Sequence, residues 1–146
     1  MMFFDGLYLF VPQEEVRSVE IIVDVQFGRQ ANGTIGKFSP HGEEAPVYCL
    51  SKELTLITDL PKTREFFTLL HTEDNLIGIA CDEVETINFA ATELYVQDIP
   101  PVMRQPGSPF TQFVIYQDSV ACISTGMRFI HYILKQSEQY QLANEL

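Results

Sequence analysis

Residues 76–87 read LIGIACDEVETI, and the meaning of the acid in the middle decides how the chain is interpreted. Residues 76–81 are apolar apart from one glycine, which is typical of a short buried strand. Asp82 ends that strand, and apolar residues return in 84–89, which predicts a second strand. Asp82 is either a catalytic acid or a turn residue. We interpret it as structural, with a carboxylate that accepts N–H groups of the residues that follow.

Composition favours a β-rich domain with its own hydrophobic core. The chain has 146 residues, of which 46% are hydrophobic, with eleven Phe, six Tyr and no Trp. This length predicts one domain, or two small barrels fused into one body. The formal net charge is −11, from 20 acidic and 9 basic residues. Such a charge opposes binding to nucleic acid or to anionic lipid, both of which rely on Lys and Arg.

Short strand patterns recur about every ten residues and predict an all-β fold. Asp-Gly at 5–6 predicts a hairpin of 3–4 with 7–11, and Val19, Ile21, Val23 and Val25 share one face of a half-buried strand over 19–25. Residues 26–46 read as a loop. The remaining expected elements are a strand at 47–50, a brief helix capped by Ser51, a hairpin of 66–70 with 76–81, a Pro-rich surface crossing at 94–109, and a hairpin of 112–116 with 119–123.

A C-terminal helix is expected over about 126–141. Met127, Ile130, Ile133 and Leu134 recur at helical spacing and should form its buried stripe. The longest apolar stretches fall far short of the roughly 20 residues that a membrane-spanning helix requires. MMFFDG at the start lacks the basic region of a signal peptide. We therefore expect a cytoplasmic protein without direct membrane insertion.

The sequence offers no pattern typical of catalysis, of a metal or of a cofactor. Cys49, Cys81 and Cys122 are far apart in apolar runs, which favours buried thiols over a disulfide framework or a zinc site. The three histidines lack metal-ligand spacing. ANGTIGKF at 31–38 departs from a phosphate-binding loop, because Ala31 replaces the first glycine and Phe38 the final hydroxyl residue. We expect no enzyme activity, no metal and no cofactor.

Several segments resemble the CheW-like domains of bacterial chemotaxis coupling proteins. IGIACDEVETI resembles their strand–Asp–strand signature through Gly78, Asp82 and Val84. YLFVPQEEVRSVEII at 8–22, IGKFSPHGEEAPVYCLSKEL at 35–54 and FVIYQDSVACI at 113–123 resemble further family segments in the family's order. Within 35–54 the matching positions are Gly36, Gly42, Pro46, Val47, Leu50 and Leu54. The likeness extends from about Phe3 to Leu134.

This resemblance implies two small five-stranded, SH3-like β-barrels joined in one body, followed by the C-terminal helix. It also implies a non-enzymatic adaptor that couples chemoreceptor cytoplasmic tips to the regulatory domain of a histidine kinase. The positions that would contact a partner are Val16, Ser18, Gly36, His41, Gly42, Gly78, Val84 and Ile87.

Val84 and Ile87 are three apart, so on a strand they would face opposite sides, and we expect Val84 to be the one available to a partner. His41 stands where the family has an arginine, whose fork of donors an imidazole does not replace. This departure leaves an alternative open, a stand-alone β-barrel that binds a small ligand or has been repurposed away from receptor–kinase coupling.

Overall fold

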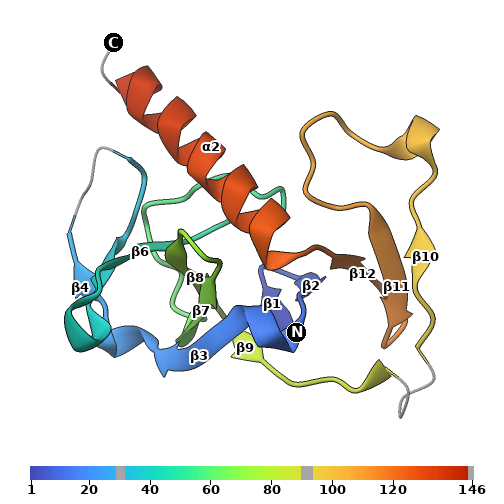
Figure 1. Ribbon diagram of the computed structural model, residues 1–146, viewed down its shortest axis with the longest axis horizontal. Helices are drawn as coiled ribbons and strands as arrows, with labels where there is room; N and C mark the ends of the chain where they lie inside the picture. The colour runs from blue at the N-terminus through green and yellow to red at the C-terminus, as the bar shows by residue number, and fades with distance from the viewer. Residues whose placement is uncertain (29–31, 90–93, 145–146) are drawn as a thin grey trace.

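A computed structural model describes residues 1–28, 32–89 and 94–144 of the chain. Within this part the structure is mostly β, with two mixed sheets and one C-terminal α-helix, as Figure 1 shows. The all-β expectation is therefore confirmed at the level of fold class.

The first sheet, which we call sheet A, gathers both ends of the β region of the chain. Its strands in order across the sheet are β10 (Gln97–Asp98), β11 (Gln112–Tyr116), β12 (Ser119–Ile123), β2 (Leu7–Phe10), β1 (Met2–Phe4) and β9 (Glu83–Val84). Among the described strands of this sheet, only β12 and β2 run parallel. Two hairpins turn on residues with positive φ, Asp5-Gly6 and Gln117-Asp118. Positive φ at both central residues is the geometry that matches strand twist in a two-residue loop.

The second sheet, sheet B, is built from the middle of the chain. Its strands in order are β3 (Val16–Ile21), β7 (Phe66–His71), β8 (Leu76–Cys81), β6 (Ala45–Tyr48), β5 (Gly36–Phe38) and β4 (Gln26–Phe27). Here β6 and β8 run parallel. β7 and β8 form the hairpin expected from residues 66–81, in register from Phe66 opposite Cys81 to His71 opposite Leu76.

In the described part of the chain, four single-turn 3-10 helices connect these strands. They are η1 (Gln13–Glu15), η2 (Ile22–Asp24), η3 (Pro40–Gly42) and η4 (Pro101–Met103). The first begins directly after Pro12.

Helix α2 (Gly126–Asn144) packs where both sheets contribute side chains. Phe129, Ile130 and Ile133 are buried in a cluster with Phe4 of sheet A and Ile79 of sheet B. The helix begins where the sequence predicted and runs three residues further. Met127, expected on the buried stripe, is 68% exposed. Phe129 takes its place because the face that packs on the core begins at Gly126.

The buried face that the sequence predicted for β3 was wrong. Val19, Ile21, Val23 and Val25 were expected on the buried face. The first three are 45%, 50% and 74% exposed, and only Val25, which follows η2, is buried. The strand begins earlier, at Val16, and gives way to η2 after Ile21, so the half-buried positions are Val16, Ser18 and Glu20. Apolar alternation alone could not show which face meets the core.

Three further expectations are corrected. The expected loop at 26–46 contains β4 and β5, which are too short to show a period of two. Ser51 caps a turn rather than a helix: its Oγ accepts the N–H groups of Glu53 and Thr55 at 3.3 and 3.2 Å. The expected strand at 84–89 is reduced to β9, because only Glu83 and Val84 pair with β1.

Candidate functional site

A cleft of about 1080 Å³ lies where the two sheets approach each other. One wall is the first four residues of β3, from Val16 to Val19. The facing wall is residues 84–89, and the end of β2, part of β11, the end of β12 and the start of α2 complete the lining. The cleft is thus assembled from segments that are far apart in the chain.

The lining combines apolar surface with a few charged groups. Phe10, Val11 and Ile123 are among its apolar residues, and its charged side chains are Arg17, Glu85 and Arg128. Arg17 forms an ion pair with Glu43. Arg128 donates from Nη1 to Thr111 Oγ1 at 3.4 Å. A concave apolar surface with sparse polar groups suits a ligand or a partner side chain.

Four of the eight predicted partner-binding residues line this cleft. They are Val16, Ser18, Val84 and Ile87. The distance in sequence between β3 and residues 84–89 means that only tertiary structure brings them together. The other four predicted positions, Gly36, His41, Gly42 and Gly78, are not part of the lining.

Val84 and Ile87 are not divided as the sequence suggested. Both are half-buried, and both line the cleft. Val84 packs against the cluster shared by the two sheets, whereas Ile87 packs against the core of sheet A. The strand argument was wrong because Ile87 lies beyond the end of β9.

Gly36 and Gly78 are buried positions on strands of sheet B. A Cβ at Gly36 would lie 2.3 Å from the Gln26 carbonyl oxygen, closer than real Cβ atoms come. A Cβ at Gly78 would lie 3.1 and 3.2 Å from side-chain atoms of Val47 and Phe67. Packing therefore explains both glycines.

His41 and Gly42 form the exposed turn before β6. Their φ angles are 51° and 85°, in the left-handed region, where glycine is unstrained and histidine is uncommon. Glu43, the next residue, holds Arg17 from the cleft wall. The turn is thus linked to the cleft through that ion pair and not through the imidazole.

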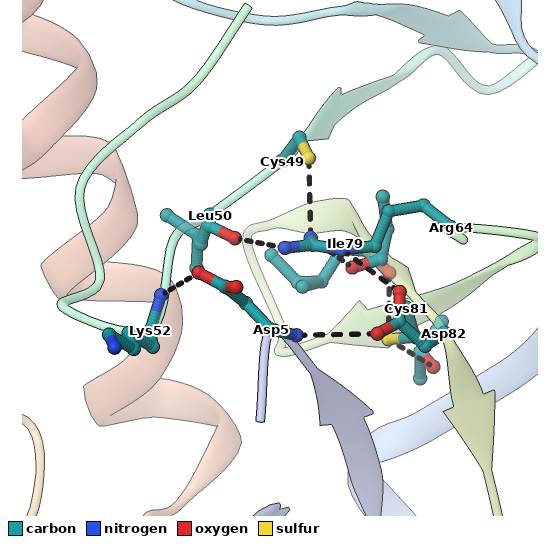
Figure 2. Close-up of polar contacts among 10 residues, drawn as sticks. Asp5, Cys49, Leu50, Lys52, Arg64, Ile79, Cys81 and Asp82 are labelled. Atoms are coloured by element: carbon teal, nitrogen blue, oxygen red, sulfur yellow. Dashed lines mark hydrogen bonds and ion pairs between the residues drawn. The ribbon is translucent and has the colours of Figure 1, made fainter. Parts of the chain in front are cut away.

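Asp82, at the end of β8, is paired with a buried arginine. Arg64 Nε lies 3.2 Å from Asp82 Oδ1, although the N–H is not aligned for a hydrogen bond. Arg64 is buried, and the Asp82 side chain is only 16% exposed. Figure 2 shows the two side chains facing each other.

The other Arg64 donors go to sheet B and to the segment after β6. Nη2 donates to the Leu50 carbonyl at 2.6 Å, and Nη1 donates to the Ala80 carbonyl at 3.3 Å and to Cys49 Sγ at 3.2 Å (Figure 2). The guanidinium carbon also lies 5.0 Å from the centre of the Phe4 ring. These contacts compensate for taking the charge out of water.

The carboxylate of Asp82 extends the network into sheet A. Its Oδ2 accepts the N–H of Asp5 at 3.3 Å, and Asp5 Oδ2 accepts the N–H of Lys52 at 2.9 Å (Figure 2). The carboxylate was expected to accept N–H groups of residues 83 and beyond. It accepts instead from the β1–β2 turn, because that turn packs against the end of β8. The network therefore joins the two sheets.

Sequence reasoning did not identify Arg64. It stands in PKTREFF, directly before an apolar strand, where an arginine is ordinarily exposed. The sequence did contain one indication of its role. Asp82 follows β8, the other strand of the hairpin that Arg64 precedes, and a buried carboxylate needs a cationic or hydrogen-bond donor partner.

The thiols have the character of core side chains. Burial raises the pKa of Cys49 to about 11 and that of Cys81 to about 12. Cys122 is half-buried, and burial raises its pKa as well. Raised pKa values disfavour the thiolate that a nucleophile or a metal ligand requires. Among the described residues, no group of three His, Cys, Asp or Glu side chains is placed to hold a metal ion.

No protein-family model matches the chain, and no curated protein matches it. Across the described ranges, no helix has the length and apolar character needed to cross a membrane.

Proposed function

We propose that this chain is a non-enzymatic adaptor of the CheW type, which couples chemoreceptor cytoplasmic tips to the regulatory domain of a histidine kinase. The observation that carries the proposal is the convergence of Val16, Ser18, Val84 and Ile87 on one cleft. These positions were chosen from resemblance alone, and they come from segments about 70 residues apart. The proposed setting for this coupling is the cytoplasm.

The proposed architecture is a pair of SH3-like barrels, one based on each sheet. In support, each sheet has an apolar cluster of its own, around Val47 and Phe67 in sheet B and around Val114 and Tyr116 in sheet A. A third cluster, which includes Phe129 of α2, is shared between them. Two separate cores with a common seam are what two fused barrels require.

The Arg64–Asp82 network supports a scaffold role over a catalytic role for the acid. The Asp82 carboxylate already forms an ion pair with a buried guanidinium and accepts a main-chain N–H. Its effect is to fix the β1–β2 turn of sheet A against β8 of sheet B, and so to hold the cleft between the sheets in one shape. A preorganised cleft binds a partner with less loss of conformational entropy.

The proposed partner contact is centred on the cleft and not on His41. The imidazole lies on an exposed turn outside the lining, while Arg17 and Arg128 supply guanidinium groups within it. An arginine in the lining can offer the planar donor fork that the family arginine would provide.

Isothermal titration calorimetry tests the proposal directly. The titrants are the kinase regulatory domain and a receptor cytoplasmic tip, both encoded in the chain's own genome. Wild-type protein should bind both titrants. Ser18→Arg places a large side chain in the cleft at β3, so it should weaken the binding of at least one of the two titrants at least tenfold. Ser119→Arg is the matched control, because Ser119 is exposed on β12 outside the cleft.

The result that contradicts the proposal is absence of wild-type binding to either titrant. Equal binding by Ser18→Arg and Ser119→Arg would place the contact elsewhere on the molecule. Circular dichroism on each variant separates lost contact from lost fold.

One observation favours a second candidate, a stand-alone domain that binds a small ligand. A cleft of about 1080 Å³ is large enough for an organic molecule of drug size. Native mass spectrometry of the purified chain tests this candidate. A retained mass that is lost from Ser18→Arg but kept by Ser119→Arg would support it over the adaptor.

A further inference from the structure

We propose that the outer edge of β3 is a strand-addition site, which takes an extended, basic segment of a partner protein as an extra strand of sheet B. β3 is the terminal strand of that sheet, and among the described residues no strand pairs with its other side. In Figure 1 it lies along the lower margin of the molecule. This inference does not depend on receptor–kinase coupling.

One hydrogen bond shows which main-chain N–H and C=O groups of β3 face β7 and which face the open edge. The Ile22 N–H donates to the Glu65 carbonyl, across from β3, at 2.9 Å. Hydrogen-bonded and non-hydrogen-bonded pairs alternate along antiparallel strands. Glu20, opposite Phe67, therefore bonds to β7, whereas the N–H and C=O groups of Val19 and Ile21 point away from β7, toward the open edge.

The side chains at those two positions are apolar and exposed. Val19 is 45% and Ile21 50% exposed, and Val23 continues the apolar surface at 74%. Natural edge strands are ordinarily blocked by lysine, by proline or by a covering segment. At Val19 and Ile21 neither residue type is present, so main-chain donors and acceptors coincide with apolar side chains. That combination is what an added strand requires.

Charge near this edge selects the occupant. Asp24 follows directly after Val23 and is exposed, with no ion pair among the described residues. Glu65 is also exposed without an ion pair in that part of the chain, and it lies across from Ile22 on the β7 side. The single basic residue of β3, Arg17, is already paired with Glu43. A second copy of the chain is a poorer occupant, because each copy has a formal net charge of −11 and the two would repel each other. A segment with apolar residues at alternate positions and Lys or Arg between them fits the edge better.

The probe is an acetylated and amidated seven-residue peptide of alternating lysine and valine. In a titration followed by NMR of the ¹⁵N-labelled protein, the amides of Val19 and Ile21 should shift and become protected from hydrogen exchange. A peptide of alternating glutamate and valine should bind at least tenfold more weakly. The lysine–valine peptide with N-methylated valines, which lacks the valine N–H donors, should also bind at least tenfold more weakly.

Two variants locate the contact. Ile21→Lys removes apolar surface and adds a like charge, and should weaken peptide binding at least tenfold. Val19→Pro removes a donor that faces the open edge without removing a β3–β7 hydrogen bond, so it should fold and bind weakly. Val102→Lys is the matched control, because Val102 is 91% exposed on η4, away from sheet B.

Some outcomes would overturn the inference. These are no binding of the lysine–valine peptide, equal binding of all three peptides, or equal binding by Ile21→Lys and Val102→Lys. A wild-type dimer in analytical ultracentrifugation that Ile21→Lys dissociates would assign the edge to a second copy instead. Thermal melting of each variant identifies any loss of fold.

Discussion

At the scale of single residues, the most informative finding concerns Asp82. Its place at the end of an apolar strand is compatible with a catalytic acid or with a turn residue. The structure gives it a buried cationic partner, Arg64, and a main-chain donor from Asp5. A residue that compensates a buried charge has a larger effect on stability than a turn residue would.

Asp82→Asn should therefore lower the free energy of unfolding by about 3 kcal/mol, because it leaves the guanidinium without its counter-charge. A carboxylate that only accepted hydrogen bonds in a turn would contribute about 1 kcal/mol to the free energy of unfolding. Urea denaturation measures the difference. Glu83→Gln, at an exposed neighbouring position, should change the free energy by less than about 0.5 kcal/mol. Equal values for the two variants would show that the ion pair does not stabilise the fold.

Removing both partners should cost less than removing the acid alone. The double variant Arg64→Met/Asp82→Asn takes away the buried charge together with its counter-charge, so about half of the single-variant loss should be recovered. The same denaturation series measures this. A strictly additive double variant would contradict direct coupling between the two side chains.

The thiols provide a prediction on reactivity. Cys49 and Cys81 are fully buried with pKa values of about 11 and about 12, so at pH 8 a disulfide reagent should react first with half-buried Cys122. Mass spectrometry of timed samples identifies the labelled residue. Rapid labelling of Cys49 or Cys81 in folded protein would revive a nucleophilic role.

The same pKa values predict that stability falls at alkaline pH. An unfolded thiol ionises near its ordinary value of 9.0, while the folded thiols stay protonated up to about 11 and about 12. The unfolded state therefore binds fewer protons in this window, and the free energy of unfolding decreases as pH rises above about 9. Melting temperatures of wild type and Cys81→Ala between pH 8 and pH 11 measure the effect. The variant should lose less stability than wild type, and equal losses would contradict the assignment to Cys81.

At the scale of elements, the sequence predicted those parts of the fold whose signals are local. Asp5-Gly6 specifies a turn with positive φ at both residues, and the hairpins at 66–81 and 112–123 are bounded by polar turns. The C-terminal helix follows from its apolar spacing. In each case the determinant lies within a few residues of the element that it defines.

The parts that were missed depend on contacts between distant segments. The apolar pattern of β3 does not say which face packs on sheet B, and β4 with two residues has no period to detect. Arg64 is buried only because Asp82 and the Leu50 carbonyl meet it. The cleft itself was not predicted; the resemblance gave only a set of eight residues. Half of that set lies outside the cleft, including Gly36 and Gly78, which are needed for close packing in sheet B.

Close packing of β4 on β5 can be tested with one methyl group. Gly36→Ala should destabilise the fold by about 2 to 3 kcal/mol, because its Cβ would lie 2.3 Å from a main-chain oxygen of Gln26 that cannot easily move. Gly28→Ala is the control, since nothing lies within 4 Å of a Cβ there. Chemical denaturation should show little change for the control. A Gly36→Ala protein of wild-type stability would contradict the close approach of the two strands.

At the scale of the whole molecule, the two sheets are held together in three ways. α2 contributes side chains to a cluster that both sheets share, the Arg64–Asp82 network links the β1–β2 turn to β8, and the main-chain Asp82 N–H donates to the Phe3 carbonyl at 2.8 Å. The cleft lies in the same seam. Its shape is therefore a property of the assembled molecule, which the proposed adaptor role requires.

The central claim is that the chain bridges a receptor and a kinase, and co-sedimentation tests it most directly. Vesicles that carry the receptor are mixed with the histidine kinase, with or without the chain, and the kinase in the pellet is measured. We predict that wild-type chain and Ser119→Arg bring kinase into the pellet, and that Ser18→Arg does so at least tenfold less. If the amount of sedimented kinase is the same with and without the wild-type chain, the bridging role is contradicted.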